Sequence, residues 1–117
     1  NLFHAAAALS GDYDQTKMPT DNLMTAAYGS FEKNKTRWSE TDNPVFSSAQ
    51  FKTPIYLGCG LQDKIVPPSQ TKIFYDALKM NCPQLNVILH EDKNAGHDYN
   101  YWNSELKNAF SFFEEEK

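Results

Sequence analysis

Two apolar runs, each followed by a polar loop and then an amphipathic helix, constrain the fold of this chain more than any other feature. The runs are residues 54–60 and 85–90, and the helices after them cover residues 67–80 and 101–116. In both helices apolar residues recur every three or four positions, which places them on one face. Strands that alternate with amphipathic helices predict a parallel sheet with right-handed crossovers.

The start of the chain adds a third strand to this pattern. Residues 2–9 are apolar and rich in alanine, and the run breaks at Ser10 and Gly11. Alanine favours helix, but a short apolar run bounded by a turn is equally typical of a buried parallel strand. Because two strands of that kind follow, we interpret this run as a strand. The predicted fold class is therefore α/β, with parallel strands and crossover helices in a three-layer αβα arrangement.

Residues 12–51 form the least regular part of the chain. Asp21 can cap a short helix that ends near Gly29. The Asp-Asn-Pro sequence at residues 42–44 predicts a second helix start and a short helix over residues 45–50. An insertion of this kind between strands either forms cap-like structure that faces a substrate or serves as connecting loops. Both interpretations stay open at the level of sequence.

Composition excludes several classes of function. The net charge is −4 and the basic residues are scattered, so we expect no nucleic-acid partner. No apolar run approaches the ~20 residues of a membrane span, so we expect none. The three histidines, His4, His90 and His97, lack the paired spacing of metal ligands, and no motif predicts a cofactor.

Cysteine content gives a weak indication of compartment. Cys59 lies in an apolar run and Cys82 in a loop after a helix, and two cysteines do not form a disulfide framework. We therefore expect buried free thiols in a reducing compartment, such as the cytoplasm, rather than a disulfide. The sequence begins at Asn1, without methionine and already inside an apolar segment, so we expect residues upstream of it and leave an export signal open.

Two polar residues follow neighbouring strands of the predicted sheet. Asp63 comes three residues after Gly60, and His97 lies in a Gly-His-Asp loop after the run at residues 85–90. A carboxylate after one strand and a histidine after the next is how α/β-hydrolases supply the acid and the base of a Ser-His-Asp triad. Each residue has a structural alternative, since either can cap the helix that follows it. Their joint placement favours the catalytic interpretation, whereas His90 and His4 are interpreted as structural.

The nucleophile of such a triad is not evident in this sequence. A G-x-S-x-G elbow is absent, and the serine that follows a strand and precedes Asp63 is Ser10. An elbow needs very small residues two positions before and two after the serine. Ala8 fits this requirement but Asp12 does not, and the polar residues after it do not start a helix. Ser10 as an unusual nucleophile is therefore the weakest of the hypotheses considered.

Longer motifs carry a resemblance to a known family. Residues 58–63 (Gly-Cys-Gly-Leu-Gln-Asp) resemble the acid loop of the esterase D-like α/β-hydrolases, and residues 95–102 resemble their histidine loop. Residues 3–11 resemble the strand and Ser-Gly turn that follow the nucleophile helix in that group. The group includes tributyrin esterases, S-formylglutathione hydrolases and enterochelin esterases. The resemblance covers nearly the whole chain and is most specific from residue 54 to residue 102.

The resemblance implies that residues 1–117 are the C-terminal portion of a single α/β-hydrolase domain. It makes Asp63 and His97 the acid and base of a serine carboxylesterase, acting on a small-molecule ester through an acyl-enzyme. The serine and the oxyanion-hole loop would lie in a missing N-terminal half, so we expect this chain alone to be inactive. We also expect it to pair with that half or to self-associate. The alternative is a non-catalytic binding or interaction module with the same fold.

Overall fold

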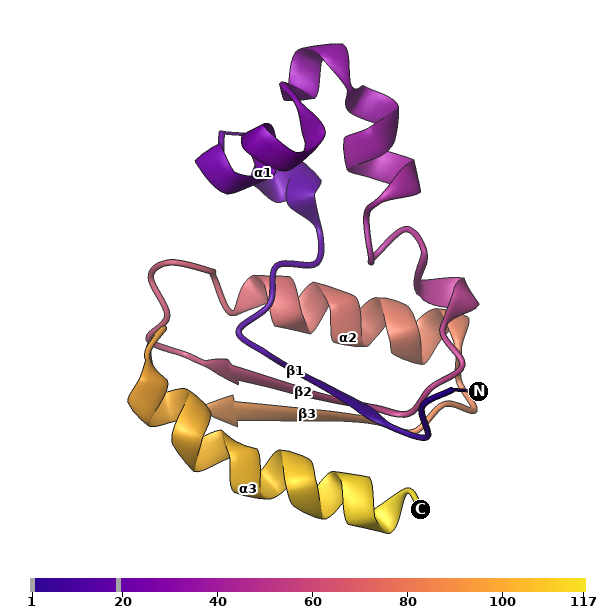
Figure 1. The fold of residues 1–117 in the computed structure, drawn as a ribbon, viewed down its shortest axis with the longest axis vertical. Coiled ribbons are helices and arrows are strands. Elements are labelled where there is room, and N and C mark those ends of the chain that lie inside the picture. The colour runs from indigo at the N-terminus through magenta and orange to yellow at the C-terminus, as the bar shows by residue number, and fades with distance from the viewer. Residues whose placement is uncertain (1, 19) are drawn as a thin grey trace.

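A three-stranded parallel sheet forms the centre of the molecule. The computed structural model describes residues 2–18 and 20–117, so the expectations that touch Asn1 and Pro19 lie outside the described residues. The strands are β1 (Ala6–Leu9), β2 (Ile55–Gly60) and β3 (Val87–Asp92), and they lie side by side in that order (Figure 1). Both pairs are parallel. The predicted parallel sheet is confirmed.

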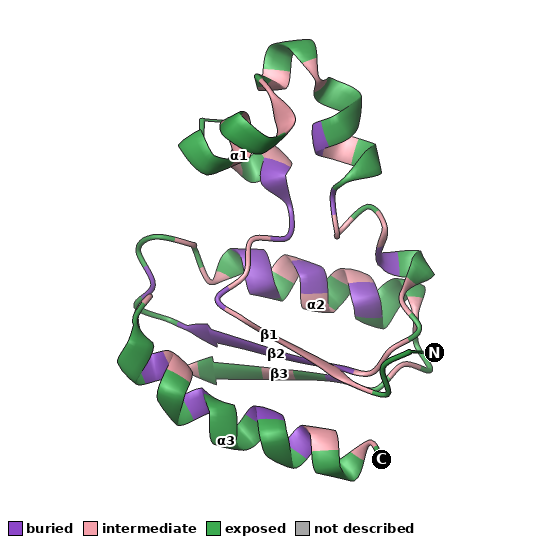
Figure 2. Cartoon of the chain, in the orientation of Figure 1, coloured by how far each residue is buried: buried purple, intermediate pink, exposed green. Residues whose placement is uncertain are grey.

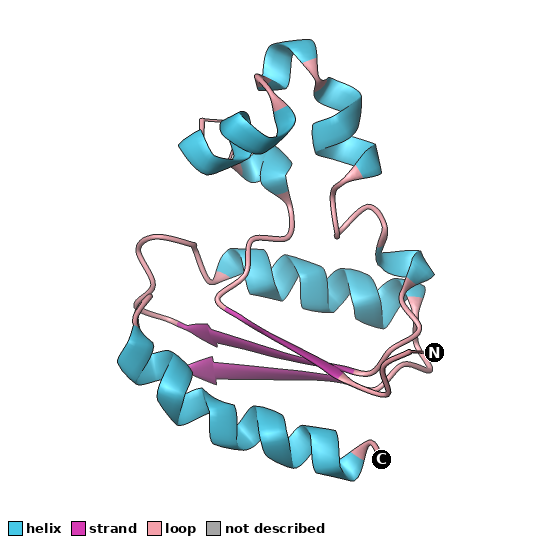
Figure 3. Cartoon of the chain, viewed as in Figure 1, coloured by secondary structure: helices cyan, strands magenta, loops and turns pink. Residues whose placement is uncertain are grey.

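Helices cover both faces of this sheet. Helix α2 (Ser69–Asn81) connects β2 to β3 along one face, and α3 (Tyr99–Glu115) follows β3 along the opposite face (Figures 1 and 3). This gives the three-layer αβα order predicted from the alternating pattern. The helix boundaries agree with the sequence to within two residues.

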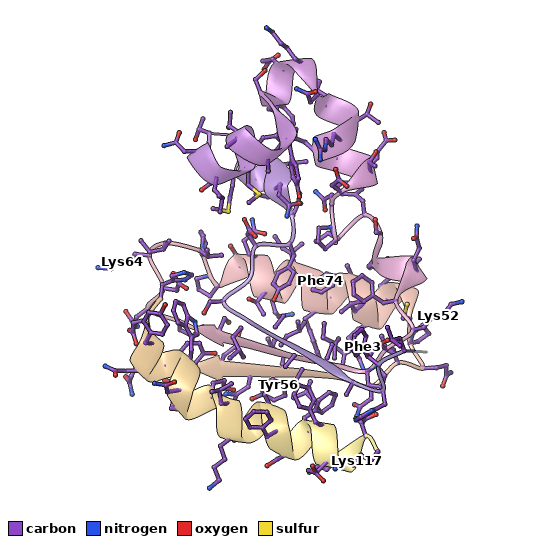
Figure 4. All side chains as sticks on the ribbon, viewed as in Figure 1. Phe3, Lys52, Tyr56, Lys64, Phe74 and Lys117 are labelled. Carbon is purple, nitrogen blue, oxygen red and sulfur yellow. The ribbon has the colours of Figure 1, made fainter. Side chains whose placement is uncertain are left out.

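Each face of the sheet has its own apolar core, because successive strand residues point to opposite faces. Leu57 of β2 faces α2, where it packs with Phe74 and Leu78. Its neighbour Tyr56 faces α3 and packs with Phe112. Figure 4 shows Phe74 on the α2 side and Tyr56 on the α3 side. The buried residues of α3 lie on the side that meets the sheet (Figure 2).

The two outer strands of the sheet differ in character. On the β3 side, His90 and Glu91 are exposed, and a charged residue such as Glu91 protects an edge from further pairing. Strand β1 consists of three alanines and Leu9 and carries no charge. No strand in the described part of the chain pairs with its outer edge. Just before β1, Leu2 and Phe3 are 91% and 68% exposed.

The segment between β1 and β2 is a series of short helical turns that lies beyond α2, on the side away from α3 (Figure 1). It comprises η1 (Gln15–Lys17), α1 (Asn22–Tyr28), η2 (Phe31–Lys33), the π-type turn η3 (Arg37–Thr41) and η4 (Ser48–Gln50). The prediction for α1 is confirmed. Asp21 Oδ1 accepts a hydrogen bond from the Met24 N–H, and Gly29 ends the helix with a φ of 78°.

The predicted helix over residues 45–50 is wrong in extent. Only Ser48–Gln50 is helical, as a 3₁₀ turn. The reason is local: the buried Asn43 side chain accepts from the N–H groups of Val45 and Phe46. Those bonds close a turn at the position where a helix was expected to start.

Polar side chains attach this insertion to α2. Gln70 Oε1 accepts from the N–H groups of Tyr13 and Asp14 at 2.9 and 2.8 Å, and Gln70 Nε2 donates to the Asp14 carbonyl at 3.1 Å. Asp14 Oδ1 accepts from Asn43 Nδ2 at 3.0 Å. The side chains of Asp14, Asn43 and Gln70 are polar and buried. Their bonds bring the start and the end of the insertion together.

Two further predictions concern the chain as a whole. Cys59 is a buried free thiol and Cys82 a half-buried one, which confirms the preference for thiols over a disulfide. Across residues 2–18 and 20–117, every helix is too short or too polar to cross a membrane.

Candidate active site

The loops after β2 and β3 meet at one edge of the sheet, since the carboxyl ends of neighbouring parallel strands lie together. Gln62 N–H donates to the Ala95 carbonyl at 2.9 Å, and Leu61 N–H donates to the Asp92 carbonyl at 2.8 Å. A Cβ added to Gly60 would lie 2.3 Å from the Ala95 oxygen. Glycine at position 60 is therefore what allows the two loops to approach so closely.

Asp63 and His97 come together across these loops. The distance from His97 Nδ1 to Asp63 Oδ2 is 2.7 Å. The Asp63 side chain is 1% exposed and that of His97 is 26% exposed, so the pair has a buried acid and an accessible ring. A carboxylate only accepts, so His97 Nδ1 carries the proton and Nε2 keeps its lone pair in the neutral ring. This is the tautomer that a general base requires.

The Asp63 carboxylate is held by its own loop. Its Oδ1 accepts from the N–H groups of Ile65 and Val66, both at 2.8 Å, which leaves Oδ2 for His97. Asp63 does not cap α2, which has no side-chain cap. One oxygen closes the loop before α2, and the other binds the histidine.

His97 lies two residues before α3 and contacts an aromatic ring from the first turn of that helix. Asp98 caps the helix, accepting from the Tyr101 N–H at 2.9 Å. The Trp102 ring meets the His97 ring edge-on, with centroids 5.0 Å apart and an interplanar angle of 87°. Tyr99 meets Trp102 in the same way at 5.0 Å and 85°. The cap therefore starts the helix at the point that puts Trp102 beside the imidazole.

Ser10 also lies near this edge, immediately after β1. It is buried, with a φ of 54°, and its N–H donates to the Gly58 carbonyl at 2.8 Å. Its Oγ accepts from Trp102 Nε1 at 3.0 Å. The structure therefore brings Ser10 to Trp102 by a hydrogen bond.

Sequence reasoning missed the pairing of Ser10 with Trp102 because it gave each residue a separate role. In the sequence, Trp102 stands among the apolar residues of the last helix, and nothing links it to Ser10. The available signal was its position four residues after the helix-capping Asp98, which puts it on the first helical turn.

His90 is engaged elsewhere, beneath α3. Its Nδ1 lies 2.7 Å from Glu105 Oε1, and the Tyr56 hydroxyl donates to the same buried carboxylate. Burial, reinforced by this hydrogen bond and by the negative charge of Glu105, raises the pKa of the Tyr56 hydroxyl above its usual range. The structure thus gives His90 a partner in the helix–sheet interface, as its structural interpretation predicted. Sequence reasoning missed Glu105, a buried acid on an otherwise apolar helix face.

Groups that would hold a metal ion do not occur in the described part of the chain. No three side chains of His, Cys, Asp or Glu gather there as ligands.

The fold and the loops at its strand ends define the class of the protein. Parallel strands, crossover helices and these loops are those of an α/β-hydrolase fold, of which this chain forms a part. The model of the prolyl oligopeptidase family, the S9 group of serine peptidases, matches residues 1–116, and the chain belongs to this family.

Solved structures agree with this fold. An acylaminoacyl peptidase from Pyrococcus horikoshii is 21% identical, with a TM-score of 0.72 over 97% of this chain and 20% of that protein. A puromycin hydrolase is 19% identical, with a TM-score of 0.78 over 99% of this chain and 19% of that protein. Dipeptidyl peptidase 4 from Porphyromonas gingivalis is 14% identical, with a TM-score of 0.78 over 97% of this chain and 16% of that protein.

Coverage is asymmetric in these matches. The chain spans about one fifth of the length of the solved structures that it resembles, and the comparison with curated proteins returns no match. The expectation of an α/β-hydrolase and of a serine hydrolase family is confirmed at that level. The esterase D-like group is not the one that these comparisons return.

Proposed function

We propose that this chain carries the acid and the base of a Ser-His-Asp triad in a serine hydrolase. Asp63 is the acid and His97 the base. The observation that carries the proposal is the 2.7 Å contact between His97 Nδ1 and Asp63 Oδ2 at the carboxyl edge of the sheet. The family match supports a serine hydrolase, and the burial of Asp63 supports its role as the group that orients the ring.

The chemistry follows from the tautomer. His97 Nε2 takes the proton of a serine hydroxyl as the serine attacks the substrate carbonyl, and the imidazolium is stabilised by Asp63. His97 then returns the proton to the leaving group, which leaves an acyl-serine. A water molecule, deprotonated by the same nitrogen, attacks the acyl group and releases the acid and the free serine.

The family match supports a substrate class for this proposal. Two of the solved structures are named acylaminoacyl peptidase and dipeptidyl peptidase 4, and the family is named for prolyl oligopeptidase. We therefore assign a peptide or acylated amine as substrate ahead of the carboxylic ester suggested by the loop motifs. Both react through the same acyl-enzyme, so a single assay series separates them.

The serine of this triad lies outside the 117 residues in this proposal. The sequence contains no G-x-S-x-G elbow, and Ser10 Oγ already accepts from the Trp102 indole. The elbow would be on a strand that pairs with the outer edge of β1. Support comes from the uncharged alanine side chains of β1 and from the exposure of Leu2 and Phe3 beside it.

The test compares the chain alone with the chain extended by its upstream coding sequence where that encodes an elbow. We expect a fluorophosphonate probe to label the extended protein and to leave the chain alone unlabelled. The extended protein should hydrolyse peptide p-nitroanilides or p-nitrophenyl esters. His97→Ala should lower the turnover rate by several orders of magnitude. His90→Ala is the matched control, since His90 has the same 2.7 Å contact with a carboxylate away from the site.

Three results would count against the proposal. Labelling of Ser10 in the chain alone would make that serine the nucleophile. Unchanged turnover in His97→Ala would remove the base assignment. An extended protein that carries an elbow and still shows no hydrolysis would favour the non-catalytic binding module.

A further inference from the structure

We propose that Trp102 is a positioning residue for His97 and that the Ser10 hydroxyl holds it in place. The proposal rests on the role of His97 given above and deepens it. It assigns a function to a hydrogen bond between the end of β1 and the first turn of α3, the bond from Trp102 Nε1 to Ser10 Oγ.

The backbone of Ser10 is held in place by the sheet. It is 6% exposed, it follows directly after β1, and its N–H donates to the Gly58 carbonyl of β2 at 2.8 Å. Its φ of 54° lies in the left-handed region, which a serine adopts only when its surroundings impose it. The backbone of Ser10 is therefore fixed by the sheet, and the bond to Trp102 Nε1 fixes its hydroxyl.

The second step concerns Trp102. Its indole N–H reaches Ser10 Oγ at 3.0 Å, across 92 positions of sequence. Rotation of the indole about its side-chain bonds would break this bond. Tyr99 meets the indole edge-on at 5.0 Å and supports it from another direction. Trp102 is thus held at two points, although it is only half buried.

The third step concerns the imidazole of His97. Its Nδ1 is fixed by Asp63, but one hydrogen bond still permits the ring to pivot about that contact. The Trp102 ring at 5.0 Å and 87° favours a single ring plane, because edge-to-face aromatic pairs have a preferred geometry. A catalytic base displaced by about 1 Å can lose about 100-fold in rate, so a second contact on the ring is valuable.

A residue that only packs would behave differently. Loss of packing lowers the free energy of unfolding without changing the state of one imidazole. Loss of a positioning contact also changes how firmly His97 Nδ1 is held against Asp63, and the ratio of the two neutral tautomers reports this directly.

The experiment measures that ratio by NMR in the folded chain labelled with ¹⁵N-histidine, at a pH where the imidazole is neutral. In the unmodified chain we expect His97 to be predominantly protonated at Nδ1. Trp102→Phe keeps a ring but removes the N–H, and Ser10→Ala removes its acceptor. Each should shift the ratio measurably toward the Nε2–H form, by at most about fivefold, because the net contribution of the lost hydrogen bond sets the upper limit.

A double variant and a matched control complete the design. Because both substitutions remove the same bond, the double variant should shift the ratio no further than Trp102→Phe alone. Trp38→Phe is the control, since Trp38 Nε1 also donates at 3.0 Å, to the Gly29 carbonyl inside the insertion. We expect it to lower stability and to leave the His97 ratio unchanged.

Several outcomes would overturn the positioning role. These are an unchanged ratio in both single variants, additive shifts in the double variant, or an equal shift in Trp38→Phe. If Trp102→Phe does not fold, Ser10→Ala decides alone, because it removes a single buried oxygen. The measurement needs no turnover, so its failure leaves the hydrolysis test intact, and failure of that test leaves the tautomer result standing.

Discussion

Replacing Asp63 by asparagine should reverse the tautomer of His97 while the loop stays folded. The side chain keeps its shape but changes from two acceptors to one acceptor and one donor. In the native loop, Oδ1 accepts from Ile65 and Val66 N–H at 2.8 Å each, and Oδ2 faces His97 Nδ1 at 2.7 Å. The amide of the new side chain can therefore turn its oxygen either toward the two backbone N–H groups or toward His97.

The two orientations differ in free energy by a calculable amount. With the amide oxygen toward Ile65 and Val66, both loop bonds survive and the NH₂ group faces His97, which must then present an unprotonated Nδ1. In the opposite orientation, two backbone donors face another donor, at a cost of about 1 kcal/mol or more each. The first orientation is favoured by about 2 kcal/mol, or about 30-fold. His97 would then carry its proton on Nε2, where it cannot act as a base.

Two measurements check this prediction. The ¹⁵N signals of His97 should change from the Nδ1–H to the Nε2–H pattern. Urea unfolding should show a loss of about 1–3 kcal/mol, because bonds to a charged acceptor become bonds to a neutral one. Asp76→Asn is the control: Asp76 forms an exposed pair with Lys72 and should change stability by less than about 1 kcal/mol.

The prediction has a clear contrary result and a functional counterpart. If His97 keeps its proton on Nδ1 in Asp63→Asn, the inferred hydrogen-bond direction is wrong. In an extended, active protein the same substitution should lower kcat by about 10⁴-fold, as it does in a well-characterised serine protease.

Two further substitutions or reactions test the surroundings of the site. Gly60→Ala should lower the free energy of unfolding by about 1–3 kcal/mol and displace the histidine loop, because the new Cβ would lie 2.3 Å from the Ala95 oxygen. Gly96→Ala is the control: its new Cβ would have its nearest atom at 3.4 Å, so urea unfolding should show little change. Burial raises the pKa of the Cys59 thiol, so the folded chain holds that proton more tightly than the unfolded chain does. The free energy of unfolding should therefore fall as the pH rises above the ordinary thiol pKa of 9.0. Ellman's reagent should modify the half-buried Cys82 before the buried Cys59. Equal reaction rates for both thiols in the folded chain would contradict the burial of Cys59.

The sheet, α2 and α3 were predictable because their signals are local. Apolar periodicity changes from strand-like runs to helical spacing at the right places, and the predicted helices over residues 67–80 and 101–116 match α2 and α3 to within two residues. The approach of Asp63 to His97 followed from topology, since neighbouring parallel strands end at one edge. Their catalytic role remains a prediction.

The insertion was not predictable to the same degree. Its backbone is fixed by buried side chains distant in sequence, such as Gln70, which binds the N–H groups of Tyr13 and Asp14. Short 3₁₀ and π-type turns have little periodicity of their own, so these bonds decide where each turn begins. The Ser10–Trp102 contact escaped prediction for the same reason, because its two partners are 92 positions apart.

The difference between the two outer strands determines how far this sheet can extend. With charged residues on β3 and only alanine and leucine on β1, growth is open in one direction. Two copies that met through β1 would consume the free edge of both, so such an assembly would end as a symmetric pair. A sheet open on both sides would instead propagate into fibres. Self-assembly through this sheet would therefore be limited to two copies.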